Sequence, residues 1–118
     1  MTVKNVTEKN INEILDNNEI IFLDFWSSTC GPCKSFAPIY EKIAAKHPDL
    51  FFGAVSAEKE QHLCEDFQIQ SVPTLVILKQ GTIIYSESGA IPEYALNNIV
   101  ANARKIDVAT LSNAEENK

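Results

Sequence analysis

The sequence predicts an α/β fold built on a mixed β-sheet. Three observations support this. Strand-like and helix-like segments alternate over the first half, two β-prone runs separated by a short turn follow, and a helical segment comes last. Parallel strands need long crossover connections, whereas a short turn joins antiparallel strands. We therefore expect about five strands, with both parallel and antiparallel pairs, flanked by about four helices.

The first predicted elements are a short strand at residues 3–6 and a helix that Thr7 can cap. Apolar side chains recur at helical spacing in this helix until Asn17. Residues 19–26 then form a nearly continuous apolar run, which is typical of a strand covered on both faces. Asp24 is the carboxylate that interrupts this run.

A longer helix is expected after Cys30, because its apolar residues fall on one face and its charged residues on the other. Pro48 should end it. Residues 50–55 indicate a further buried strand, and residues 58–67 a short helix. Helices that connect successive strands in this way predict that the connected strands run parallel.

The second half predicts an antiparallel hairpin followed by a helix. Residues 74–78 and 82–86 are rich in β-branched and aromatic side chains, and Lys79, Gln80 and Gly81 join them. The last helix should start near Pro92, where the missing N–H of proline costs least, and run to about residue 103.

Composition and charge exclude several classes of protein. A chain of 118 residues can bury roughly two thirds of its unfolded surface, so it needs no disulfide staples. Ten Lys and Arg against sixteen Asp and Glu give a net charge of -6, which argues against nucleic acid and against an anionic membrane as partners. Neither a leader pattern nor a membrane-length apolar run is seen, so we expect a cytoplasmic protein, with a monomer as the default.

Two of the three cysteines, Cys30 and Cys33, form a CGPC motif where a buried strand gives way to a helix. Unpaired N–H groups and the helix dipole at that end should lower the pKa of the Cys30 thiol from about 8.5 toward neutral. We therefore predict Cys30 as the nucleophile and Cys33, more buried, as the thiol that acts second. Gly31 permits close approach by a partner, and Pro32 presets the helical φ angle.

A zinc site is the first alternative for a CxxC pair, and two unrelated structural cysteines are the second. Zinc would need two more ligands, which only His62 and Cys64 offer. These two residues have one residue between them and lie on a different predicted helix, a spacing that matches no common zinc motif. Both alternatives are therefore weaker than a redox pair, which suits a reducing compartment.

The motifs resemble those of the thioredoxin family. The matching runs, in family order, are LDFWSSTCGPCKSFAPIYEKIA, SVPTLVILKQG and SESGA. The resemblance implies the thioredoxin fold, a reversible dithiol–disulfide cycle of Cys30 and Cys33, and no bound metal or cofactor. It covers a single domain at residues 1–105 and leaves 106–118 as a partly disordered C-terminal tail. Since lowered cysteine pKa values are known in this family, the pKa argument above agrees with the resemblance and is not independent of it.

The resemblance also assigns roles to individual residues. Asp24 matches a buried carboxylate that assists proton transfer at the inner thiol; burial would raise its pKa, whereas a carboxylate hydrogen-bonded to backbone is the alternative. Pro73 matches a cis-proline that faces the active site, and Val72 offers backbone groups to an extended substrate. Gly89 matches the loop that completes the substrate groove, with a simple turn glycine as the alternative. Trp26 matches the aromatic residue beneath the active-site loop.

Three positions depart from the family pattern. Thr29 stands where a second tryptophan is usual, which reduces the apolar rim and places a hydroxyl near Cys30. Ala54 replaces a lysine that many members carry near the buried carboxylate, so Asp24 should have a higher pKa. Cys64 is additional, and we interpret it as a small core residue, with a regulatory or dimer-forming thiol as the alternative.

The predicted function is a thiol–disulfide oxidoreductase that reduces disulfides in protein substrates and is recycled by a reductase such as thioredoxin reductase. The alternative is a thioredoxin-fold binding module, or a client-specific redox partner with little general reductase activity. Glutaredoxins and secreted oxidants fit less well, because Gly31 and Pro32 do not match the dipeptides usual between their cysteines.

Overall fold

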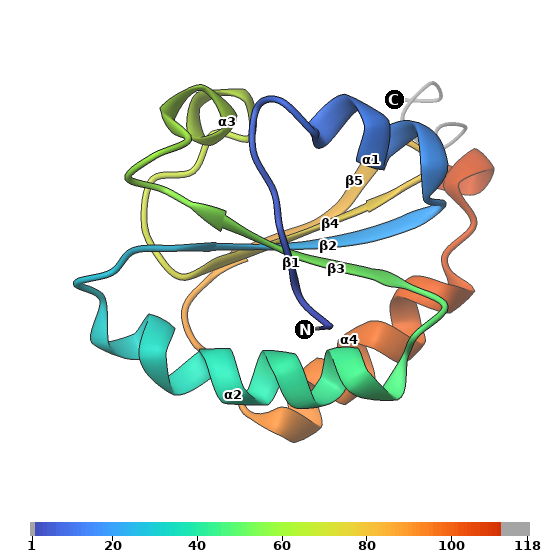
Figure 1. Cartoon of the computed structure of the whole chain (residues 1–118). Coiled ribbons are helices and arrows are strands. Elements are labelled where there is room, and N and C mark those ends of the chain that lie inside the picture. The colour runs from blue at the N-terminus through green and yellow to red at the C-terminus, as the bar shows by residue number, and fades with distance from the viewer. Residues whose placement is uncertain (1, 112–118) are drawn as a thin grey trace.

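A five-stranded sheet lies between two layers of helices in the computed structural model, which describes residues 2–111 (Figure 1). The strands are β1 (Lys4–Asn5), β2 (Ile20–Trp26), β3 (Phe51–Ser56), β4 (Thr74–Lys79) and β5 (Thr82–Ser88). The helices are α1 (Ile11–Asn17), α2 (Gly31–Lys46), α3 (Gln61–Asp66) and α4 (Glu93–Lys105). The helices α1 and α3 cover one face of the sheet, and α2 and α4 cover the other. The predicted α/β class is confirmed.

The strand order is β1-β3-β2-β4-β5. The first three of these strands run parallel, whereas β4 is antiparallel to both β2 and β5. The predicted mixture of crossover-linked parallel strands and one antiparallel hairpin is therefore confirmed. The apolar run of β2 lies at the centre of the sheet, with helices on both faces, which explains why six of its seven residues are buried.

The core has two halves, one on each face of the sheet. Phe22 points toward α2 and α4, where its ring stacks on Phe52 with centroids 4.5 Å apart and Tyr40 meets Phe52 edge-on at 5.6 Å. Leu23 and Phe25 contribute to the other half, beneath α1 and α3. Each fully buried side chain of this size contributes about 1.5–3 kcal/mol. Successive side chains of β2 point to opposite faces of the sheet, so this one strand packs against both helix layers.

The edge strand β1 is shorter than the predicted strand at residues 3–6. Its pairing with β3 requires the N-terminal segment to come close to Gly53. It pairs with β3 so that Lys4 lies beside Gly53 and Asn5 beside Ala54. A Cβ atom on Gly53 would overlap the side chain of Val6, so glycine at this position lets the N-terminal segment reach the sheet.

The predicted boundaries of two helices are wrong. Thr7 does not cap α1, because residues 8–10 form a turn and the helix starts at Ile11. The Asn10 side chain accepts the N–H of Thr7 at 2.8 Å, which stabilises that turn. The helix α3 is also shorter than the expected 58–67. Residues 57–59 form a turn and the helix starts at Gln61, while Gln68, with φ +56°, takes the chain out of helical geometry soon after Asp66.

The hairpin between β4 and β5 closes through Gln80 and Gly81, with Lys79 as the last residue of β4. Both turn residues have positive φ angles, +53° and +78°. A two-residue turn with positive φ angles matches the right-handed twist of the two strands that it joins. Glycine at the second position adopts a positive φ without the steric cost that a side chain would add. The predicted hairpin is confirmed, with a turn one residue shorter than expected.

Beyond α4, residues 108–111 form one more helical turn, in which Val108 is 9% exposed. The tail expected at 106–118 stays a prediction; this turn falls at its start, and residues 112–118 lie outside the described part. Within residues 2–111, no helix is both long enough and apolar enough to cross a membrane.

Candidate active site

Cys30 and Cys33 lie at the N-terminus of α2, where β2 and its following loop deliver the chain. Cys30 is the N-cap residue, and its Sγ accepts the N–H of Cys33 at 3.1 Å. Pro32 occupies the first turn, as its fixed φ angle favours. The two sulfurs form a disulfide, with the Cα atoms 5.2 Å apart. Cys33 is 4% exposed while Cys30 is only partly buried, so the Cys30 side of the pair is the accessible one.

The loops that precede β4 and follow β5 meet beside Cys30. The Val72–Pro73 peptide bond is cis, as the resemblance implied, and the carbonyl oxygen of Val72 lies 3.7 Å from Cys30 Sγ. Gly89 donates its N–H to the carbonyl of Pro73 at 2.8 Å. Its φ of +105° lies in the region that favours glycine. Residues far apart in the sequence therefore form one wall next to the outer sulfur.

Asp24 is buried on β2, with only 4% of its surface exposed. Its Oδ1 accepts no hydrogen bond from any of residues 2–111, which argues against the alternative of a carboxylate satisfied by backbone N–H groups. Burial raises the pKa of Asp24 from 3.8 to about 7. A carboxyl group with this pKa can both accept and release a proton near neutral pH.

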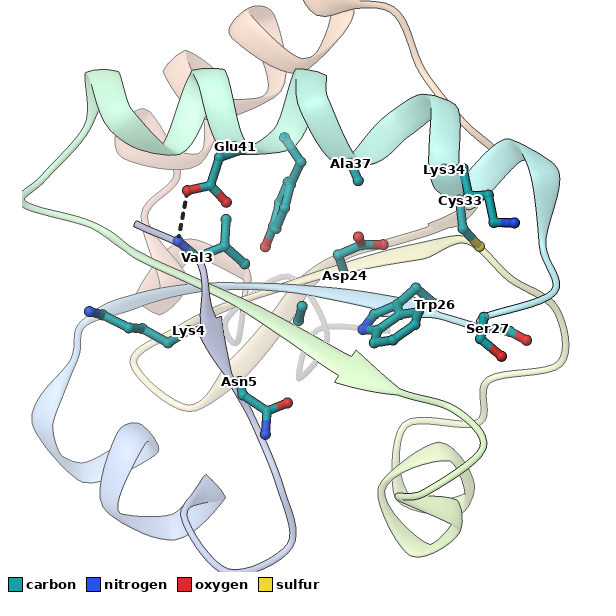
Figure 2. Close-up of a pocket in the computed structure, with 13 residues that line it drawn as sticks. Val3, Lys4, Asn5, Asp24, Trp26, Ser27, Cys33, Lys34, Ala37 and Glu41 are labelled. Atoms are coloured by element: carbon teal, nitrogen blue, oxygen red, sulfur yellow. Dashed lines mark hydrogen bonds between the residues drawn. The ribbon is translucent and has the colours of Figure 1, made fainter. Parts of the chain in front are cut away.

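Asp24 and Cys33 line the same cavity, which has a volume of about 570 Å³ and opens beside the N-terminal half of α2 (Figure 2). Trp26 forms part of its wall, below the Asp24 carboxyl group in this view. The structure thus brings together the predicted Asp24, Trp26 and Cys33 on one side of the cysteine pair. Val72, Pro73 and Gly89 form the wall on the side of Cys30.

Comparison with known proteins identifies the family. The family model described as Thioredoxin matches residues 2–102. The chain belongs to the thioredoxin family. A protein of Streptomyces coelicolor that carries the provisional name thioredoxin 2 is 42% identical over 103 residues, which cover 87% of this chain and 77% of that protein. A thioredoxin of Haemophilus influenzae is 32% identical over 83% of this chain and 94% of its own length.

Solved thioredoxin structures share the fold. A thioredoxin of Plasmodium falciparum superimposes with a TM-score of 0.78 at 31% identity, over 85% of this chain and 98% of that one. Spinach chloroplast thioredoxin f, in its short form, gives 0.77 at 31% identity, over 86% and 93% of the two chains. The predicted thioredoxin fold is therefore confirmed.

Family membership and the CxxC pair together establish the activity. The chain is a thioredoxin-type thiol–disulfide oxidoreductase, a protein-disulfide reductase whose redox group is the Cys30–Cys33 disulfide. Thioredoxins carry no bound cofactor. Membership also implies protein substrates and a reductase as partners.

The active-site loop of this thioredoxin family member is held by a residue that the sequence did not reveal. Glu58, in the turn before α3, accepts the backbone N–H of Ser28 at 2.8 Å and its hydroxyl at 3.0 Å. These bonds lower the pKa of Glu58, the backbone N–H having the larger effect. Thr29, the departure from the usual tryptophan, places its hydroxyl 3.3 Å from that of Ser27.

The two other departures have distinct surroundings. Ala54 lies directly beside Asp24 in the pairing of β2 and β3, so its methyl group borders the cavity where many thioredoxins have a lysine. Cys64 lies on α3, half-buried against the core half beneath that helix, with Sγ 3.9 Å from the carbonyl of Ala57. Burial is the main cause that raises the pKa of Cys64.

Proposed function

We propose that Cys30 attacks the substrate disulfide and that Cys33 completes the reduction. The Cys30 thiolate forms a bond to one substrate sulfur, and the other substrate sulfur leaves and takes up a proton. The Cys33 thiol then loses its proton and attacks Cys30 Sγ, which releases the second substrate thiol and forms the Cys30–Cys33 disulfide. Two electrons pass from the pair to the substrate. The position of Cys30 as N-cap of α2, with the Cys33 N–H directed at its sulfur, carries this assignment.

We assign the proton transfer at Cys33 to Asp24. Both groups border one cavity, and the Asp24 pKa of about 7 suits a base that works near neutral pH. In Asp24→Asn the second step should slow by about tenfold or more, because no carboxylate accepts the Cys33 proton. Rapid-mixing measurement of mixed-disulfide release tests this, and an unchanged rate would remove Asp24 from the mechanism.

The substrate groove proposed here lies along Val72, Pro73 and Gly89, with Gly31, Thr29 and Trp26 as its opposite rim. The support is the position of the Val72 carbonyl, 3.7 Å from Cys30 Sγ, and the hydrogen bond that fixes Gly89 to Pro73. An extended substrate segment can pair with exposed backbone groups at such a site. The substrates would be proteins that contain disulfides, and neither nucleic acid nor membrane is expected.

The test of the function is reduction of insulin disulfides with dithiothreitol as electron donor. Wild-type protein should accelerate the reaction well beyond the uncatalysed rate, and Cys30→Ser should not. A wild type no faster than Cys30→Ser would overturn the proposal. The variant Cys33→Ser should trap many mixed-disulfide clients, whereas a stable complex that survives loss of both thiols would favour a binding module.

We also propose a monomer in a reducing compartment, the cytoplasm, with a reductase such as thioredoxin reductase as the recycling partner. The cycle restarts only from the reduced pair, which such a compartment maintains. Within residues 2–111 the exposed large apolar side chains are Ile83, Tyr94 and Leu111, on three separate segments. Scattered residues of this kind do not require a partner surface.

A further inference from the structure

The cavity beside Asp24 adjoins the proposed protein-substrate groove at Trp26 and extends away from it along β1 and α2. It is bordered by β1, the end of β2, β3 and α2, and neither Cys30 nor any of Val72, Pro73 and Gly89 is among the residues that line it. Figure 2 shows the cavity extending from Cys33 and Trp26 past Asp24 to Val3. Its volume of about 570 Å³ falls in the range of small-molecule sites, roughly 300–1,000 Å³.

Two alanines leave this space open. Ala37 faces the cavity from α2 and Ala54 from β3, the latter directly beside Asp24 in the strand register. A longer side chain at either position would fill the space in front of the carboxyl group. The walls are mainly apolar, with Val3 and the indole of Trp26 among them, which suits a compact apolar molecule.

Asp24 is the buried carboxyl group that borders this space. Its Oδ1 is unbonded among residues 2–111, and only 4% of the residue is exposed. Lys4 and Lys34 also border the cavity, but Figure 2 shows both ammonium groups directed away from Asp24. Glu41 is already bonded, because its Oε1 accepts the N–H groups of Thr2 and Val3. In Asp24 a ligand would therefore meet a buried carboxyl group with an unbonded oxygen.

We propose that this cavity binds a small organic ammonium: a molecule with a compact apolar or aromatic body and one protonated amine. The ammonium would donate to the Asp24 carboxylate, and the body would lie between Trp26 and the two alanines. An aromatic wall is also a favourable neighbour for a cation. The net charge of -6 adds a general attraction for cations.

The probe is 2-phenylethylamine, and the matched neutral probe is 2-phenylethanol. Titrations followed by amide and indole NMR use the oxidised protein at pH 8, above the pKa of Asp24. The amine should bind about tenfold more tightly than the alcohol, because a charge-assisted bond is stronger than a neutral one. Resonances of Asp24, Ala54 and the Trp26 indole should shift. Equal affinity for the two probes, no saturation up to about 10 mM, or shifts confined to other residues would overturn the proposal.

Variants separate the carboxyl group from the space around it. Asp24→Asn should remove the preference for the amine and leave both probes with similar, weak affinity. Ala37→Leu should weaken both probes by about tenfold or more by filling the cavity from an exposed helix position that favours leucine. Ala45→Leu, on the exposed part of α2 away from the cavity, is the control and should bind like wild type. A retained amine preference in Asp24→Asn, or wild-type binding by Ala37→Leu, would contradict the site.

This measurement needs no thiol turnover. A failure to bind the amine would therefore leave the insulin result untouched, and a failure to reduce insulin would leave the binding result untouched.

Discussion

Two ionisable side chains are buried at opposite ends of the central strands, and their hydrogen bonding differs completely. Asp24, at the active-site end of β2, is 4% exposed, and its Oδ1 is unbonded among residues 2–111. Lys79, at the other end of β4, is 6% exposed. Its ammonium donates to the carbonyls of Ala103, Arg104 and Ile106 at 2.9, 3.0 and 2.7 Å. The three N–H groups of the ammonium are therefore matched by three carbonyl oxygens.

The difference suggests different roles: the charge of Lys79 stabilises the fold, whereas the carboxyl group of Asp24 is available for chemistry. The Lys79 ammonium satisfies carbonyls at the C-terminal end of α4 and so fastens that helix to the sheet. Asp24 has no such compensation, and an uncompensated buried carboxylate costs stability. Its position beside Cys33 is consistent with a role in proton transfer, because a carboxyl group with a pKa near 7 can exchange protons at neutral pH.

The largest expected effect is a gain in stability from Asp24→Asn at alkaline pH. The unfolded pKa is near 3.8 and the folded pKa about 7, so the unfolded state ionises first as pH rises. Wild-type stability should therefore fall between about pH 4 and pH 7 and stay low above that. Asparagine removes this loss, which amounts to about 4 kcal/mol at pH 8.

Guanidinium unfolding of both oxidised proteins measures this gain. Near pH 4 they should differ by less than about 1 kcal/mol, because Asp24 is then protonated in the folded state and only about half ionised in the unfolded state. A difference independent of pH would mean that Asp24 does not titrate in this range, and the contrast with Lys79 would collapse.

Lys79→Met should have the opposite sign. Loss of the ammonium leaves three carbonyls without their donor, and we expect the free energy of unfolding to fall by about 2–3 kcal/mol at any pH between 5 and 8. Lys9→Met, at an exposed position before α1, is the control and should change stability by less than about 0.5 kcal/mol. Equal effects of the two substitutions would show that the three bonds to Lys79 contribute nothing net.

The sequence predicted the larger elements because their patterns are long. The apolar run of β2 and the helical periodicity of α2 extend over enough residues to identify both elements. The ends of the short elements β1, α1 and α3 were predicted wrongly, because single contacts determine where such short elements begin and end. The bond from Asn10 to the Thr7 N–H, which moves the start of α1, is one such contact.

The site was predictable where the chemistry is local in the sequence. Cys30, Cys33 and the strand-to-helix junction are contiguous, and the family resemblance supplied the distant Pro73. Glu58 and Lys79 were missed because their partners lie 30 and more than 20 residues away and carry no motif. From the sequence alone, a glutamate in a charged segment and a lysine next to a turn are both expected to be exposed to solvent.

Glu58→Ala tests whether the active-site end also contains a structural charge. Without the carboxylate, Ser28 loses two hydrogen bonds, and the loop before Cys30 should be less well positioned. We expect insulin reduction to slow by about threefold, with a small effect on stability because the pair is exposed. Asp66→Ala, at an exposed position of α3, is the control and should keep wild-type activity. Equal rates for both variants would make the Ser28–Glu58 contact incidental.

Cys64 gives the smallest expected effect and extends the comparison to a neutral group. Like Asp24, it has a pKa raised mainly by burial, but it lies on α3 and borders neither the cavity nor the proposed groove. A raised pKa lowers the thiolate fraction, so Cys64 should react slowly with iodoacetamide and form little disulfide-linked dimer under air.

Cys64→Ala should keep wild-type insulin reduction and lower the free energy of unfolding by about 1 kcal/mol, the cost of removing a half-buried sulfur from the core beneath α3. Alkylation rates and non-reducing gels, compared with the Cys30→Ser/Cys33→Ser double variant in which Cys64 is the remaining thiol, provide the measurement. Fast alkylation or ready dimer formation by that double variant would make Cys64 a reactive thiol. The molecule would then have two reactive groups, Asp24 and Cys64, that are buried or half-buried and have raised pKa values. Burial and a raised pKa would no longer be enough to distinguish Asp24 from Cys64.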